Sequence, residues 1–133
     1  MDRVDIKTNT ERRLQSFGIE VKSSDEWTLN FIIDKTVNCI KSNCNIADIP
    51  DELLYVTVDM ACGEFLSYKK NSGGLDTEKF NFDMVQKSIQ EGDTRVDFYV
   101  EGTETNEQKF NKLVDSLVSG HKGDLETYRC IKW

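Results

Sequence analysis

A catalytic site needs reactive side chains that can converge on one point, and the candidates in this sequence are few. The one histidine, His121, lies in a Gly-His-Lys-Gly turn with no orienting partner beside it. The spacing patterns of phosphate-binding loops, zinc proteases and serine hydrolases do not occur. Asp59 lies beside the apolar face of an expected helix and fits a boundary residue better than a general base. The sequence predicts that the chain is not an enzyme; the alternative requires two close, buried carboxylates.

The four cysteines do not have the spacing of a metal site. Cys39 and Cys44 are five residues apart, which places them roughly 140° apart around a helix, and no C-x-x-C occurs. Cys39, Cys44 and Cys62 fall inside apolar helical patterns, where a free cysteine behaves as a small hydrophobe. Together with Cys130 they are expected to be core or surface thiols. We expect no metal and no cofactor.

Length and composition favour one domain, residues 1–133. The chain has 133 residues, of which 38% are hydrophobic, and its mean hydropathy is -0.54. This hydrophobic content is low but still typical of a globular protein. No apolar run approaches the roughly 18 residues that a membrane span requires. Residues 1–10 are polar and charged, which does not fit a signal peptide, so we expect a cytosolic protein without membrane contact.

The charge is negative and uneven. The net charge of -7 has the wrong sign for a protein that binds duplex DNA through a basic patch. Between Asp76 and Glu107, nine acidic residues oppose three basic ones, a net charge of -6 for that stretch alone. This stretch is either a solvated acidic loop or a surface that repels something anionic.

Apolar residues at the 3.6-residue period predict four helices. Ala61, Cys62 and Gly63 lie in the middle of one of them and would let another helix approach closely. The two longest helices are joined by a short connection, which favours an antiparallel pair. The four expected ranges are Asn9–Phe17, then Ser24 as N-cap to about Asn43, then Asp48–Glu52 as the opening of a helix that ends at Gly73-Gly74, and Glu107–Ser119 capped by Asn106.

The remaining segments show other patterns. Phe80, Phe82 and Val85 fit either a helix or an extended segment, a turn signal surrounds Gly92, and strand alternation follows it. We expect a β-hairpin or extended arm over about 80–102 with its tip at Gly92. Its apolar, strand-like face comprises Val96, Phe98 and Val100.

The C-terminal tail, residues 121–133, has no helical period. It either folds back on its own core or provides an interface, because it is rich in residue types that are common at interfaces. The fold class is therefore mainly α: a small helical bundle (core about 8–74 and 106–120) with the arm and the extended tail. The candidate interface residues of the tail are Leu125, Tyr128, Arg129, Ile131, Lys132 and Trp133.

The order of these segments resembles the small head–tail connector (adaptor) proteins of tailed bacteriophages. The resemblance covers nearly the whole chain and rests on the helix opened by Ile49-Pro50-Asp51-Glu52-Leu53, an arm with Glu91-Gly92-Asp93-Thr94, and the ending Tyr128-Arg-Cys-Ile-Lys-Trp133. It implies a virion protein of the neck, assembled in the host cytoplasm, that forms a ring, commonly of twelve copies. The ring would join the portal protein to a tail-side neck or tail terminator protein.

The resemblance also implies that the ring continues the DNA channel without binding DNA specifically. An acidic lining suits a conduit through which DNA slides. The alternative is another phage or bacterial interaction module, such as a tail completion protein or a regulator, that forms no ring. The candidate lining residues are Glu91, Asp93, Asp97 and Glu101.

Overall fold

The described part of the chain folds into five α-helices and two short 3-10 turns. The structure is a computed structural model and describes residues 3–77, 80–92, 105–120 and 125–126. Over these ranges the protein is mainly helical and has no strand, which confirms the predicted fold class. The elements are α1 (Arg3–Ser16), the 3-10 turn Ser23–Asp25, α2 (Glu26–Cys44), the 3-10 turn Asp51–Leu53, α3 (Leu54–Asn71), α4 (Phe82–Gly92) and α5 (Asn106–Ser119).

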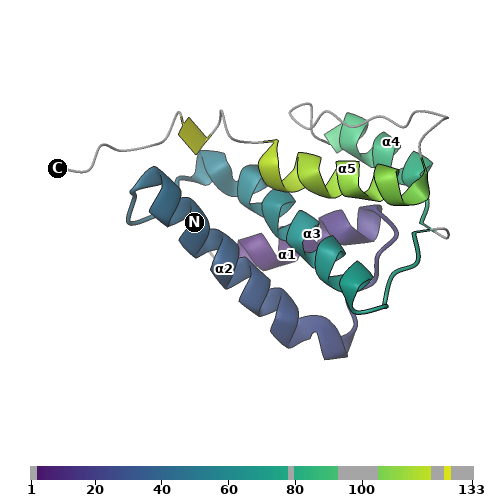
Figure 1. Cartoon of the computed structure of the whole chain (residues 1–133). Coiled ribbons are helices and arrows are strands. Elements are labelled where there is room, and N and C mark those ends of the chain that lie inside the picture. Colours follow the sequence, from purple (N-terminus) through teal and green to yellow (C-terminus); the bar gives the residue numbers. More distant parts are fainter. Residues whose placement is uncertain (1–2, 78–79, 93–104, 121–124, 127–133) are drawn as a thin grey trace.

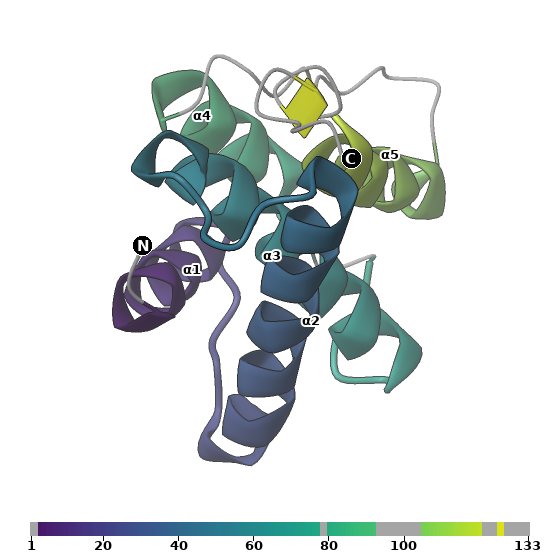
Figure 2. The same ribbon diagram turned by 90° about the vertical axis from the view of Figure 1, so that its left-hand side faces the viewer.

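Helix α3 lies in the middle of the bundle. It contacts α1, α2 and α5, and α4 packs next to α1. Figures 1 and 2 show α1 and α4 on one side of α3, with α2 and α5 toward the other. Helices α2 and α3 run in opposite directions, as their short connection predicts (Figure 1). Because neighbours surround α3, eleven of its residues are buried, including the small residues Ala61, Cys62 and Gly63.

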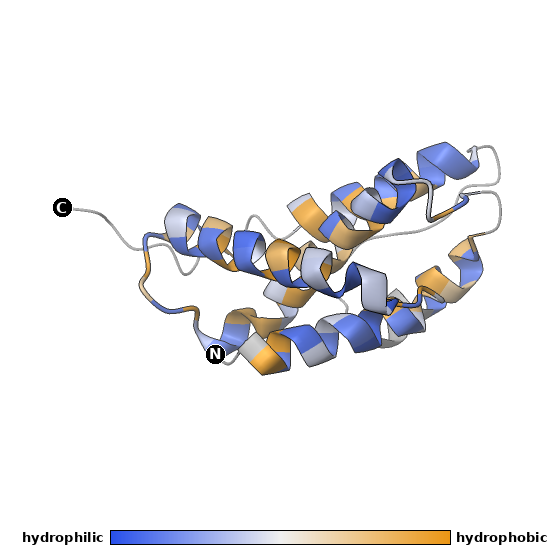
Figure 3. Ribbon diagram, turned by 90° about the horizontal axis from the view of Figure 1, so that it is seen from below, coloured by the Kyte–Doolittle hydropathy of each residue, from blue (hydrophilic) through white to orange (hydrophobic). Residues whose placement is uncertain are grey.

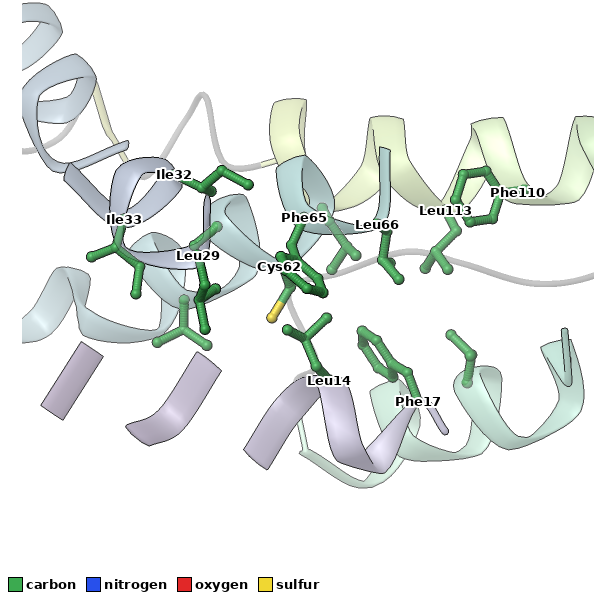
Figure 4. Packing of buried hydrophobic residues seen from close by; sticks show 14 of the residues in the cluster. Leu14, Phe17, Leu29, Ile32, Ile33, Cys62, Phe65, Leu66, Phe110 and Leu113 are labelled. Atoms are coloured by element: carbon green, nitrogen blue, oxygen red, sulfur yellow. The ribbon is translucent and has the colours of Figure 1, made fainter. Parts of the chain in front are cut away.

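The main core forms where α1, α2, α3 and α5 meet. Leu14 of α1 and Phe17, which follows the end of α1, face Phe65 and Leu66 of α3 (Figure 4), and all four are at most 1% exposed. Burial of an apolar side chain of this size stabilises the fold by about 1.5–3 kcal/mol. The outer helices carry hydrophilic residues as well as apolar ones (Figure 3), as amphipathic helices around a shared core must.

A second, smaller core closes the end of the bundle where α2 passes into α3. Leu125, at the start of the tail, packs against this cluster, and the Cys44 thiol donates a hydrogen bond to the Leu125 carbonyl oxygen at 3.3 Å. Leu125 therefore lies beside the C-terminal end of α2. The buried residues of this cluster are Ile40, Cys44, Ile49, Leu53, Val56 and Met60.

The C-terminal ends of the helices agree with the predicted glycine stops, whereas the predicted N-terminal caps of α2 and α5 are wrong. Gly18 and Gly73 have φ of +82° and +81°, so each ends its helix in the left-handed region that favours glycine. Ser24 does not cap α2, because it lies inside a 3-10 turn that runs into the helix. The hydroxyl of Thr105, rather than Asn106, caps α5 by accepting a hydrogen bond from the Gln108 N–H.

The expected β-hairpin arm is wrong over its first half, because Phe82–Gly92 is the helix α4. Gly92 ends this helix and is not a hairpin tip. Phe82 and Val85, three residues apart, lie on the same side of a helix, and both are buried in the main core. Phe80, just before α4, makes edge-to-face contacts with Phe82 and with Phe110 of α5. Residues 93–102 of the expected arm lie outside the described residues.

Gly63 sets the distance between α3 and α5. A Cβ atom at this position would lie 2.6 Å from Val118 Cγ2, 3.0 Å from Leu117 Cβ and 3.3 Å from the Val114 carbonyl oxygen. The first of these distances is far inside van der Waals contact, so any side chain at 63 would force the two helices apart. The close approach expected from the small residues of α3 is thus confirmed at Gly63.

We expect Gly63→Ala to lower the free energy of unfolding by about 1–2 kcal/mol. Overpacking of this kind costs about 1–3 kcal/mol, and alanine regains up to about 1 kcal/mol in helix propensity. Urea unfolding measures the difference. Ser67→Ala, on the same helix at a half-buried position, is the matched control and should change stability by less than about 0.5 kcal/mol. A Gly63→Ala protein as stable as the wild type would contradict the close packing.

Candidate functional site

The cysteine, histidine and acidic residues of the described chain do not gather into a metal-binding group. Over the ranges that the structure covers, no three histidine, cysteine or acidic side chains come together in a metal-binding group. Cys39 is exposed, whereas Cys44 and Cys62 are buried. Burial raises the pKa of the Cys62 thiol well above its ordinary value, so this thiol stays protonated. Cys62 and Cys44 are core residues, as predicted, and His121 and Cys130 lie outside the described residues.

Asp59 is a buried ion-pair residue, which corrects the expectation of a boundary position. It is only 2% exposed, and its Oδ1 lies 3.3 Å from Arg13 Nε. The Arg13 guanidinium also lies over the Phe17 ring, 5.1 Å from its centroid. The pair joins α1 to α3 inside the bundle. Its carboxylate therefore serves the packing of these two helices.

A second buried ion pair joins the start of α2 to the end of α3. Lys69 Nζ lies 2.8 Å from Asp25 Oδ2, and the Lys22 N–H donates to the same oxygen at 3.2 Å. The hydrogen bond from Lys69 lowers the pKa of Asp25 despite the opposing effect of burial. In the sequence, Lys69 is recognisable only as a basic residue in the last turn of the helix that became α3. Its partner is 44 positions away, and no sequence signal links the two.

Among the described residues, two exposed aromatic rings lie side by side on the outer face of α2. Trp27 is 74% exposed and Phe31 is 54% exposed. Their rings stack at 5.6 Å between centroids with 12° between the planes. We call these two residues the α2 aromatic pair. Both rings are open to solvent in the described part of the chain. Exposed tryptophan and phenylalanine are the side chains that protein interfaces favour.

A groove lies between the C-terminal half of α1 and the segment that leads into α2. Its volume is about 500 Å³, and we call it the α1 groove. Ile19 and Val21 line the groove, are partly buried and pack against the main core. Three of its lining residues are glutamates, and one of them, Glu26, accepts a hydrogen bond from Lys7 at 2.6 Å, which raises the pKa of Lys7. The lining residues are Glu11, Gln15, Gly18, Ile19, Glu20, Val21 and Glu26.

Most residues predicted to form an interface lie outside the described residues. Of the tail residues predicted to form an interface, only Leu125 is described, and it packs against the second core of its own chain. Glu91 belongs to α4. The predictions for the remaining residues therefore stay predictions: Val96, Phe98 and Val100 of the arm, Tyr128, Arg129, Ile131, Lys132 and Trp133 of the tail, and the acids Asp93, Asp97 and Glu101.

Comparison of the chain with known protein families, with curated proteins and with solved structures found no match. None of the helices in the described ranges is both long and apolar enough to span a membrane. A proposal of function therefore depends on the α2 aromatic pair, the α1 groove and the resemblance of the sequence segments to head–tail connector proteins.

Proposed function

We propose that this chain is a structural subunit of a phage neck, which assembles into a ring that joins the portal of the capsid to the tail. The observation that carries the proposal is the α2 aromatic pair. Two stacked rings on a solvent-facing helix surface stabilise nothing in their own core, whereas removing them from water at an interface is favourable. This is the surface of a subunit that works through contact with other protein chains.

A ring requires two different complementary surfaces on each subunit, because its contacts run head to tail. The α2 aromatic pair and the acidic α1 groove support one such surface on the described helical body. The complementary surface would include the arm and tail segments that the resemblance assigns to contacts between subunits. Portal and tail-side neck or terminator proteins would occupy the two open faces of the ring.

The acidic stretch suits the channel of such a ring. With a net charge of -6 between residues 76 and 107 of each copy, a ring would form a strongly negative collar. Such a collar repels DNA phosphates and prevents tight binding, which allows DNA to slide. In this proposal, the channel is lined by Glu91, Asp93, Asp97 and Glu101. DNA moves through it without being bound specifically.

The mass of the assembled protein tests the proposal. We expect native mass spectrometry of the concentrated full-length chain to show one species whose mass is a fixed multiple, well above two, of the 15.3 kDa chain. A closed ring gives one dominant stoichiometry because each head-to-tail interface is satisfied. A protein that stays a monomer or stops at a dimer would overturn the ring and favour an interaction module that serves a single partner.

A further inference from the structure

The α1 groove has the chemistry of a peptide-binding site. Ile19 and Val21 provide an apolar floor that rests on the main core. Glu11, Glu20 and Glu26 provide carboxylates, and Lys7 neutralises one of them through its hydrogen bond to Glu26. The lining thus keeps a surplus of about two negative charges, counted as three glutamates less Lys7. Such a groove favours an extended segment that carries both cationic and apolar side chains.

The C-terminal tail of the chain has this composition. Residues 127–133 contain two cations, Arg129 and Lys132, and the apolar or aromatic residues Tyr128, Ile131 and Trp133, with no acidic side chain. We propose that the α1 groove binds the tail of a neighbouring copy of this chain. The inference rests on the proposed self-assembly and names the contact through which one subunit holds the next.

Chain length separates binding to a neighbour from binding to the same chain. The Leu125 carbonyl is held by Cys44 at the C-terminal end of α2, whereas the α1 groove includes Glu26 at the first residue of α2. Eighteen helical residues place these two ends about 27 Å apart. From Leu125, an extended chain carries the Cα of Arg129 at most about 14 Å. The Arg129 of one tail therefore cannot reach the Glu26 end of the groove in its own chain, which favours the tail of a neighbouring copy.

The proposed contact would also bring a bound tail close to the α2 aromatic pair. Trp27 follows Glu26 directly, so the exposed rings begin where the groove lining ends. A tail in the groove and a subunit against the rings would belong to one continuous interface. A contact between the tail of one copy and the groove of the next joins two different surfaces of the subunit. It is therefore head-to-tail, which is the arrangement that a ring needs.

Disulfide trapping between two full-length variants tests this inference. The groove variant carries Gln15→Cys and Cys130→Ser, the tail variant keeps Cys130, and both carry Cys39→Ser to remove the exposed thiol. Mixed under mild oxidation, they should form a disulfide between position 15 of one chain and Cys130 of the other. Glu11→Lys with Glu20→Lys in the groove variant should lower the yield by about tenfold, and Arg129→Glu with Lys132→Glu in the tail variant should restore it.

The control moves the cysteine to Asn111, which lines another hollow that also contains two acids, Glu64 and Asp115. Equal trapping at positions 15 and 111 would overturn the inference, as would trapping that ignores the charge reversals. Native mass spectrometry of the same wild-type chain separates the two proposals. An assembled protein without trapping at position 15 overturns the groove and leaves the ring, whereas charge-dependent trapping without a ring supports the groove and overturns the ring.

Discussion

Replacing Lys69 by methionine is expected to lower the free energy of unfolding by about 3–5 kcal/mol. Lys69 is the hydrogen-bond and charge partner of Asp25, and both side chains are buried. Methionine keeps the length and apolar stem of lysine but removes its charge. The Asp25 carboxylate then stays buried with only the Lys22 N–H, and an uncompensated buried charge is among the most destabilising single changes.

Urea unfolding at neutral pH measures this loss, and two variants serve as controls. Lys70→Met removes a neighbouring lysine that pairs with the largely exposed Glu107 at 3.3 Å, so it should cost less than about 1 kcal/mol. Asp25→Asn in the Lys69→Met background removes the orphaned charge and should recover part of the loss. A Lys69→Met protein no less stable than Lys70→Met would contradict the role of the pair.

Acid should reduce the difference between wild type and Lys69→Met. Because Lys69 lowers the pKa of Asp25 in the folded protein below its ordinary value of 3.8, the pair stabilises the fold above that value. This contribution is lost as the pH falls through the lowered pKa. Protonation also removes the buried charge from the variant. The same urea titration, repeated in acid, should therefore show the two proteins converging.

Replacing both rings of the α2 aromatic pair is expected to weaken self-assembly by about 30-fold or more. Tryptophan at the centre of an interface typically contributes 2 kcal/mol or more to binding, about a 30-fold change in affinity. Trp27→Ser with Phe31→Ser should leave the fold intact, because both rings are largely exposed and the α2 core residues point the other way. Sedimentation velocity over a concentration series measures the loss, and circular dichroism checks the helices.

Tyr55→Ser is the matched control for this double variant. Tyr55 is another exposed aromatic residue, 66% accessible, at the start of α3, and it lies outside both proposed surfaces. Its loss should leave assembly unchanged. If Tyr55→Ser weakens assembly more than the double variant does, the interface lies elsewhere on the bundle and the α2 aromatic pair is not its centre.

The sequence predicted the helical bundle well because the signals involved are local. The periodicity of α2 and α3, the stops at Gly18 and Gly73 and the small residue Gly63 all act within a few residues of where they appear. The sequence left helix and extended segment open for the residues of α4. The arm was favoured because a turn signal and a strand-like pattern follow, although Phe82 and Val85 already have helical spacing.

The candidate site depended on relations that a sequence does not display. Asp59 is buried because α3 has neighbours around it, and the number of neighbours of a helix is a tertiary property. The two sides of the α1 groove come together only when α1 packs next to the start of α2. The α2 aromatic pair could have been found: Trp27 and Phe31 are four residues apart, on the side of the helix away from Leu29 and Ile33.

Electron microscopy of the concentrated full-length protein tests the central claim most directly. We propose that copies of this chain bind one another head to tail through surfaces of the helical body and the C-terminal tail. The images should then show closed rings of a single copy number around a central opening, and these rings should be lost in the Trp27→Ser, Phe31→Ser protein. Single bundles, or particles unaffected by the two substitutions, would contradict it.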